Sequence, residues 1–207
     1  MTSWVLVGGG AFAREVIGWI RSDAQGGAST VRGYVAQEAD AGMDAYGVAW
    51  LGKPSAFQPV ADDQLLLVIG DPAAKRKVVG ELAAHHDLFA SFVHSSALVH
   101  FTAKLGVGVV VCPRSVVSAD ARIGDFVTIN LMCSIGHDVV LGDYSNLSAH
   151  VDLTGYVQVG EDAFFGSGAR VLPRVKIGER ARVGAGATVV RSLAPDTSVY
   201  TTPAKRI

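Results

Sequence analysis

The sequence predicts a fold in two parts, a small α/β domain over residues 1–92 and an all-β domain of short repeated strands over residues 93–207. Three observations lead to this expectation. Segments typical of strands and helices alternate in the first part, and an aliphatic or aromatic residue recurs every six positions in the second. The composition also combines 24 glycines with only 18% charged residues, whereas an ordinary mixed α/β domain carries about 25%.

The first part is expected to form a small parallel sheet with helices between its strands. Asp71 can cap the second helix, with Pro72 in its first turn. The apolar runs predict strands at 4–7, 31–35, 48–51 and 65–69, and the helical segments are 11–21 and 72–84.

A glycine-rich turn joins the first strand to the first helix. Gly8, Gly10 and Ala13 match the pattern G-x-G-x-x-G/A, in which a tight backbone lies beside the free N–H groups of a helix N-terminus that attract phosphate. This turn is either purely structural or a phosphate site for a nucleotide sugar, with Gly8, Gly10, Ala11 and Asp71 as substrate-binding residues. The domain is about half the length of a complete dinucleotide-binding fold, which argues against NAD.

The second part is a repeat of six residues that runs without interruption from Val93 to Val189. Glycine follows the apolar residue at 106, 124, 136, 142, 160, 166, 178 and 184, and the fourth residue after it is mostly small or β-branched. A period of six fits neither a helix nor a continuous strand, so it predicts a short strand followed by a corner. Glycine suits such a corner because it tolerates a positive φ. The apolar series is Val93, Val99, Leu105, Val111, Val117, Ile123, Ile129, Ile135, Leu141, Leu147, Leu153, Val159, Phe165, Val171, Ile177, Val183 and Val189.

Composition and charge exclude several classes of protein. Eighteen Lys and Arg balance nineteen Asp and Glu, which argues against a nucleic-acid surface. No apolar run approaches the roughly 20 residues of a membrane span. Cys112 and Cys133 do not make a disulfide framework, and no signal peptide is recognised, so we expect a cytoplasmic protein.

The repeat resembles the hexapeptide-repeat acyltransferases, and the whole chain resembles the sugar acetyltransferases of the sialic acid O-acetyltransferase (NeuD) and bacillosamine N-acetyltransferase (PglD) type. The resemblance implies a left-handed parallel β-helix with three hexapeptides per coil, and acetyl-CoA as co-substrate. It also implies a nucleotide sugar held by the N-terminal domain, and a homotrimer with active sites between subunits. The matching segments are VGGGAFAREV (7–16), IGDPAAKRKVV (69–79), VHSSALVH (93–100), GHDVVLGDYS (136–145) and PAKRI (203–207).

The resemblance assigns catalytic roles to three residues. His137, in the segment I-G-H-D, is the implied general base that takes a proton from the acceptor, with Asp138 holding or stabilising the ring. Gly155 follows 18 residues later, one coil along, and its backbone N–H is the implied oxyanion donor. It stands outside the glycine phase of the repeat, because Thr154 follows Leu153.

Four residues are expected to contact the cofactor, and no metal is expected. In the resembled family, the position of Asn146 carries a second histidine near acetyl-CoA, and Gly155 is expected to contact the thioester of acetyl-CoA. Pro173 is expected near the pantetheine arm. Lys205, in the terminal PAKRI, is expected near the phosphates of coenzyme A.

Two alternative functions stay open at this point. A zinc hydratase of the γ-carbonic anhydrase type would use the same β-helix, but it needs a close H-x4-H pair, and His94 and His100 are separated by five residues. A non-enzymatic scaffold that binds nucleotide sugars is the other alternative. The sugar, the nucleotide and the choice between N- and O-acetylation are not fixed by the sequence.

Overall fold

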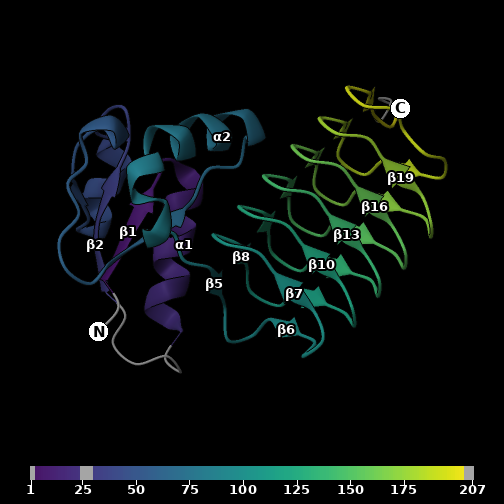
Figure 1. Cartoon of the computed structure of the whole chain (residues 1–207), viewed down its shortest axis with the longest axis horizontal. Helices are drawn as coiled ribbons and strands as arrows, with labels where there is room; N and C mark the ends of the chain where they lie inside the picture. Colours follow the sequence, from purple (N-terminus) through teal and green to yellow (C-terminus); the bar gives the residue numbers. More distant parts are fainter. Residues whose placement is uncertain (1–2, 24–29, 203–207) are drawn as a thin grey trace, which may run out of the picture.

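The computed structural model describes residues 3–23 and 30–202. A small α/β domain lies beside a long stack of triangular coils, and the chain passes from the first to the second at β5 (Phe92–Val93) (Figure 1). This confirms the predicted fold class.

The N-terminal domain is built on a four-stranded parallel sheet with the order β3-β2-β1-β4. The four predicted strands are all present, within two residues of their expected bounds. They are β1 (Ser3–Val7), β2 (Thr30–Val35), β3 (Ala49–Trp50) and β4 (Asp63–Leu67).

Helices cover both faces of this sheet. One apolar cluster joins α1 (Ala11–Ser22) to Leu6 and Leu66, and another joins α2 (Pro72–Glu81) to Val5 and Leu67. The second helix ends three residues earlier than expected and continues as the 3-10 helix η3 (Ala83–Leu88). Two further 3-10 helices, which the sequence pattern did not predict, are η1 (Ala41–Tyr46) and η2 (Pro54–Ala56).

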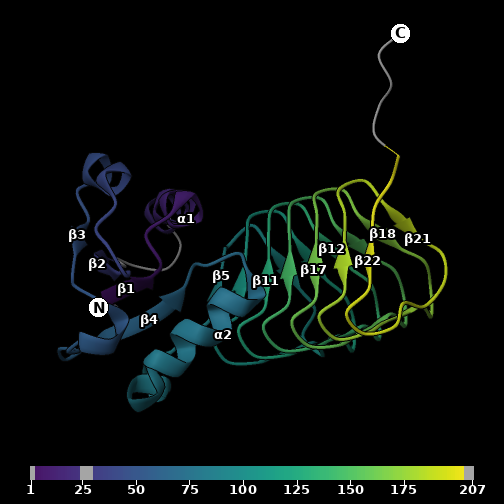
Figure 2. The ribbon, with the colours of Figure 1, turned by 90° about the horizontal axis from the view of Figure 1, so that it is seen from above.

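The second part is a left-handed parallel β-helix with three flat faces, here called the prism (Figure 2). Each face is a parallel sheet of two-residue strands. The seven-stranded sheet contains β5, β8 (Val110–Val111), β11 (Thr128–Ile129), β14 (Asn146–Leu147), β17 (Phe164–Phe165), β20 (Arg182–Val183) and β22 (Ser198–Val199). The six-stranded sheet contains β6 (Leu98–Val99), β9 (Val116–Val117), β12 (Ser134–Ile135), β15 (Asp152–Leu153), β18 (Arg170–Val171) and β21 (Thr188–Val189). The five-stranded sheet contains β7 (Lys104–Leu105), β10 (Arg122–Ile123), β13 (Val140–Leu141), β16 (Gln158–Val159) and β19 (Lys176–Ile177).

The register of the prism confirms three hexapeptides per coil. Thr128 pairs with Asn146, and Asn146 pairs with Phe164, so stacked residues are 18 positions apart. The apolar series is buried from Val111 to Val189. The first three members are less buried: Val99 and Leu105 are partly buried, and Val93 is 39% exposed.

The repeated glycines stand at the corners for a different reason from the one predicted. A positive φ recurs every six residues, but two positions after the glycine slot and mostly on other residue types, as at Asp138 (φ 58°) and Tyr156 (φ 62°). The glycines instead permit the coils to stack closely. A Cβ atom at Gly136 would lie 2.8 Å from the backbone nitrogen of Gly155 in the next coil.

The N-terminal domain packs against the seven-stranded face of the prism. Val110 and Cys112 belong to the apolar cluster around α1, and Phe126 belongs to the cluster around α2. In Figure 2, α2 begins beside this face and extends away from the prism. No helix within the described ranges is long and apolar enough to cross a membrane.

Candidate active site

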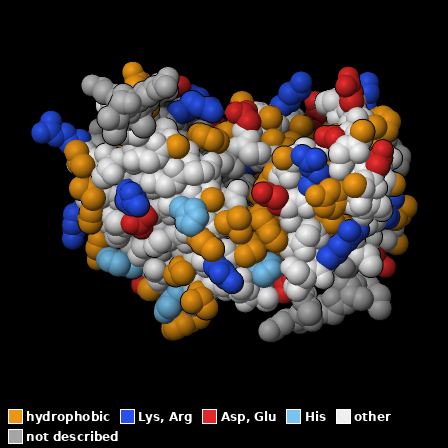
Figure 3. All heavy atoms as spheres, turned by 180° about the vertical axis from the view of Figure 1, so that it is seen from behind, with side chains coloured by type: hydrophobic (Ala, Val, Ile, Leu, Met, Phe, Trp, Pro, Cys, Tyr) orange, Lys and Arg blue, Asp and Glu red, His pale blue; other side chains and the backbone are white. Residues whose placement is uncertain are grey.

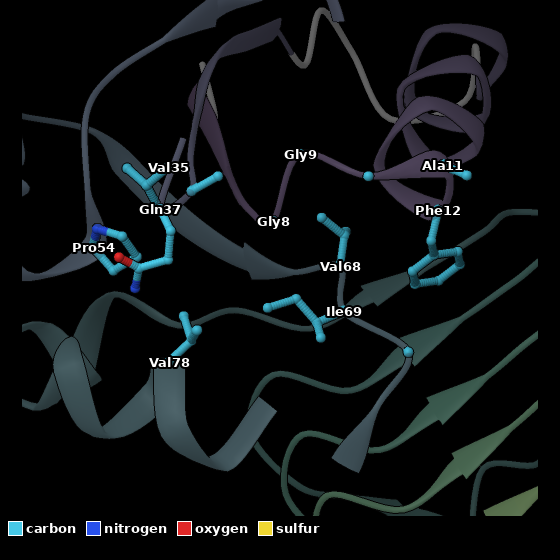
Figure 4. A pocket seen from close by; sticks show the side chains of 13 residues that line it. Gly8, Gly9, Ala11, Phe12, Val35, Gln37, Pro54, Val68, Ile69 and Val78 are labelled. Carbon is cyan, nitrogen blue, oxygen red and sulfur yellow. The ribbon is translucent and has the colours of Figure 1, made fainter. Parts of the chain in front are cut away.

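The glycine turn after β1 opens into a cavity of about 410 Å³ (Figure 4). Gly8 adopts φ +122°, and a Cβ atom there would meet Val68 and Ile69 at about 3 Å, so this position requires glycine. Gly10 is the N-cap of α1 and supplies no side-chain cap, which leaves the first N–H groups of the helix free to bind an anion. The predicted Gly8, Gly10 and Ala11 therefore line one cavity.

The two ends of this cavity differ in character. Val35, Pro54 and Val78 form apolar walls at one end, where Gln37 extends between Pro54 and Val78 (Figure 4). The amide of Gln37 donates a hydrogen bond to Glu81 (2.8 Å). Phe12 lies at the other end, which is nearer the prism strands (Figure 4), and Gly70, which also lines the cavity, lies beside Asn146 of the prism.

Asp71 caps α2, as expected, but does not line this cavity. Its Oδ1 accepts a hydrogen bond from the backbone N–H of Ala74 (3.0 Å), and Oδ2 lies 3.8 Å from the Arg182 guanidinium of the prism. Half of the Asp71 side chain is exposed. A direct contact between Asp71 and the substrate therefore stays a prediction.

His137 lies on the edge where the six-stranded and five-stranded sheets of the prism meet. We call this edge the His137 corner, formed by the turns 136–139, 154–157 and 172–175. The Nδ1 atom of His137 lies 2.8 Å from Oδ2 of Asp138, and both side chains are partly exposed. The Tyr156 ring meets the imidazole edge-on, with 5.0 Å between ring centroids.

Gly155 lies directly against the imidazole of His137. A Cβ atom at Gly155 would lie 2.6 Å from Nε2 of His137, closer than any real contact. The backbone N–H of Gly155 has no hydrogen-bond acceptor among the described residues. The structure thus brings the three predicted catalytic residues together, with an imidazole nitrogen and an unused N–H group side by side.

The residues expected to hold the cofactor do not gather around His137 within one chain. Pro173 is exposed on the His137 corner, one coil beyond Gly155, next to Arg174, whose guanidinium stacks on Tyr156 (4.5 Å to the ring centroid). Asn146 lies on the seven-stranded face beside Gly70 of the N-terminal domain. Lys205 falls outside the described residues.

The glycine-turn cavity and His137 also lie on different sides of the prism. The N-terminal domain covers the seven-stranded face, and the His137 corner is the edge opposite that face, where the other two sheets meet. In one chain, therefore, a ligand in the cavity is separated from His137 by the body of the prism.

Lys75 is a buried charged residue that the sequence analysis did not identify. Its Nζ donates to the carbonyl of Phe126 (3.1 Å), Oγ1 of Thr128 (2.8 Å) and the carbonyl of Ser145 (3.2 Å), all in the prism. Burial lowers the pKa of Lys75 to about 7, because the charged form loses its water. The helical spacing of Pro72, Lys75 and Val79 was the signal that placed this lysine on the buried face of α2.

Arg76, the next residue, forms exposed ion pairs with Glu161 (2.9 Å) and Asp162 (2.8 Å) and stacks on Tyr144. Together with Lys75 it joins α2 to the prism. Within residues 3–23 and 30–202, no group of three His, Cys, Asp or Glu side chains is placed to hold a metal ion.

Comparison with known proteins gives one family model and several similar structures. The model described as "Bacterial transferase hexapeptide (six repeats)" matches residues 156–191. PerB from Caulobacter crescentus, crystallised with CoA and GDP-perosamine, is 34% identical, with 99% of this chain and 97% of that chain covered and a TM-score of 0.82. A search of curated protein sequences found no match.

Two structures with lower sequence identity share the fold over almost the whole chain. The acetyltransferase domain of PglB from Neisseria gonorrhoeae, in complex with acetyl coenzyme A, is 21% identical, covers 99% of this chain and 98% of that chain, and gives a TM-score of 0.85. WeeI from Acinetobacter baumannii is 20% identical, with 99% of each chain covered and a TM-score of 0.84.

Proposed function

From the premise that this chain belongs to the family of hexapeptide-repeat sugar acetyltransferases and uses acetyl-CoA, we propose that it acetylates the amino group of a sugar linked to a nucleoside diphosphate. His137 is the general base of this reaction. The observation that carries the proposal is the position of the His137 imidazole, with Nδ1 at Asp138 and Nε2 against Gly155.

The contact with Asp138 supports the role of His137 as a base. A carboxylate at Nδ1 favours the tautomer in which Nδ1 carries the proton, so Nε2 keeps its lone pair. As the acceptor amine attacks the carbonyl carbon of the thioester and forms the new C–N bond, Nε2 takes one proton from the amine nitrogen. A positioned base of this kind contributes about 10²–10⁴-fold in rate.

Gly155 supports the same step on the side of the carbonyl oxygen. Attack turns this oxygen into an oxyanion, which needs a hydrogen-bond donor already in place. The unused N–H of Gly155 is such a donor, next to Nε2 of His137. When the intermediate collapses, the C–S bond breaks and the coenzyme A thiolate leaves, taking up a proton.

The acceptor class follows from the glycine-turn cavity together with the relative that binds GDP-perosamine. The open N-terminus of α1 at Gly10 suits a diphosphate, and the apolar end of the cavity suits a nucleoside. PerB, which covers the same length of chain, was crystallised with a nucleoside diphosphate amino sugar. The nucleobase is left open.

An assembly of several chains, which we propose to be the trimer implied by the resemblance, completes the site. A sugar bound in the cavity of one chain needs His137 from a neighbouring prism, because its own His137 lies on the opposite edge. Leu98, Phe101 and Val116 are exposed near the first coils of the six-stranded sheet, at 69%, 91% and 37%, which suits contact with another copy. Hydrophobic side chains also gather on the side of the molecule seen in Figure 3.

The test measures turnover of acetyl-CoA with a panel of UDP-, GDP- and dTDP-linked amino sugars, GDP-perosamine among them. Turnover is detected as the free thiol of coenzyme A that the reaction releases. Mass spectrometry of the product should show one acetyl group on the sugar nitrogen. Free sialic acid serves as the hydroxyl acceptor. Acetylation of sialic acid together with no turnover of any amino sugar would contradict the proposed acceptor.

A further inference from the structure

Asn146 is a buried polar side chain without a hydrogen-bond partner. It points outward from β14 on the seven-stranded face, yet only 5% of the residue is exposed, because the N-terminal domain lies over it. No hydrogen bond joins its amide to any described residue. The small area that stays exposed includes the amide atoms, so these atoms are free to bind a ligand that enters beside β14.

The position of Asn146 relates it to the glycine-turn cavity. Its Oδ1 lies 3.8 Å from the place that a Cβ atom would take at Gly70. Gly70 lines this cavity. Phe12 lies at the end of the cavity nearer the prism, whereas Gln37 and Pro54 lie at the far end (Figure 4). The amide therefore stands where the cavity meets the prism.

The direction of the bound nucleotide sugar follows from this arrangement. The open N-terminus of α1, which carries Phe12, lies at the side of the cavity opposite Pro54 and Val78 (Figure 4) and suits the diphosphate. The nucleoside then fills the apolar end near Pro54 and Val78. The sugar must extend out of the cavity at the end near Gly70, because its amino group has to reach a histidine of another prism.

We propose that Asn146 positions the acceptor sugar, with its amide hydrogen-bonded to oxygen atoms of the sugar ring. This inference rests on the proposed function and gives Asn146 a different ligand from acetyl-CoA, which the resemblance implied. The backbone next to it is held in place, since Lys75 donates to the carbonyl of Ser145 and to Thr128, which pairs with Asn146 from the preceding coil. Asn146 acts by positioning and takes no proton.

The test replaces Asn146 by leucine, which keeps the size of the side chain and removes its polar atoms. The matched control is Gln158→Leu, because Gln158 is an exposed amide on the five-stranded sheet, away from the N-terminal domain. Michaelis constants are measured for acetyl-CoA and for the nucleotide amino sugar that the wild-type enzyme uses best. The inhibition constant of the corresponding nucleoside diphosphate, without sugar, is measured in parallel.

We expect Asn146→Leu to raise the KM of the nucleotide sugar about tenfold, the effect of losing one or two hydrogen bonds. The KM of acetyl-CoA and the inhibition constant of the nucleoside diphosphate should not change. The melting temperature should change little, because the Asn146 amide makes no hydrogen bond with a described residue that leucine would lose. Gln158→Leu should leave all these constants unchanged.

Two outcomes would overturn the inference while the proposed function stands. The first is a nucleotide-sugar KM that does not change in Asn146→Leu, and the second is an effect confined to the KM of acetyl-CoA or to the nucleoside diphosphate. If the wild-type enzyme acetylates no sugar of the panel, the proposed function fails, and this inference fails with it.

Discussion

Replacing Gly155 by alanine adds one methyl group to the backbone that faces the imidazole of His137, the proposed general base. The new Cβ atom would lie 2.6 Å from Nε2 of His137, whereas ordinary contacts begin at 3.4 Å, so the ring must retreat by about 0.8 Å. The ring can do so, because more than half of the His137 side chain is exposed. The free energy of unfolding should therefore fall by less than about 1 kcal/mol.

The loss of activity should be much larger than the loss of stability. A misplacement of about 1 Å in a catalytic group costs up to about 10²-fold in rate. We expect the kcat of Gly155→Ala to fall about 10- to 100-fold, or roughly 1.4–2.7 kcal/mol in activation free energy. Its backbone N–H is kept, so the oxyanion donor is still present.

A double-mutant cycle with His137→Ala separates displacement of the ring from damage to the backbone. The assay is release of free thiol at saturating acetyl-CoA and nucleotide sugar. Because the added methyl group acts through the imidazole, Gly155→Ala should have little further effect once His137 is alanine. Wild-type kcat in Gly155→Ala would refute the reasoning, and so would an equal loss in the presence and absence of His137.

Three further predictions concern the orientation of the base, the buried lysine and the assembly. Asp138→Asn removes the carboxylate that orients the ring, so kcat should fall about tenfold with unchanged KM, and steady-state kinetics showing an unchanged kcat would argue against that role. The pKa of Lys75 falls from 10.5 to about 7 on folding, so the unfolded chain binds more protons between these values and wild-type stability should rise with pH there, by about 1 kcal/mol per unit. Urea unfolding of Lys75→Met, which lacks this titration, is the reference, and parallel curves for the two proteins would contradict the assignment. Co-expression of His137→Ala with Gly10→Asp, whose added charge repels the diphosphate, should restore about a quarter of wild-type activity if sites form between randomly mixed chains, whereas a site within one chain would restore none.

Most of the fold was predictable from the sequence because its two periodicities are local. The six-residue series predicted the buried aliphatic column from Val111 to Val189, and the apolar runs predicted the strands of the first domain. The reason for the corner glycines was not predictable. Whether Gly136 serves a positive φ or a close approach depends on Gly155 in the next coil, which a single repeat does not contain.

The three candidate catalytic residues were predicted from the family resemblance around a short motif, and the structure brings His137, Asp138 and Gly155 together. The placement of Asn146 was not predictable, because the motif does not say which face of the prism the N-terminal domain covers. Lys75 was missed for a related reason. Its burial depends on carbonyl groups of the prism that are 51 and 70 residues away in the sequence.

The role of His137 as general base is tested most directly by the single-turnover rate of acetyl transfer in His137→Ala. The enzyme is saturated with acetyl-CoA and nucleotide sugar, and binding of both and the oligomeric state are checked against the wild-type protein. The rate should fall about 10²–10⁴-fold while binding and assembly stay unchanged. A rate within a few-fold of the wild-type rate would contradict the account, because the amine would then lose its proton without this imidazole.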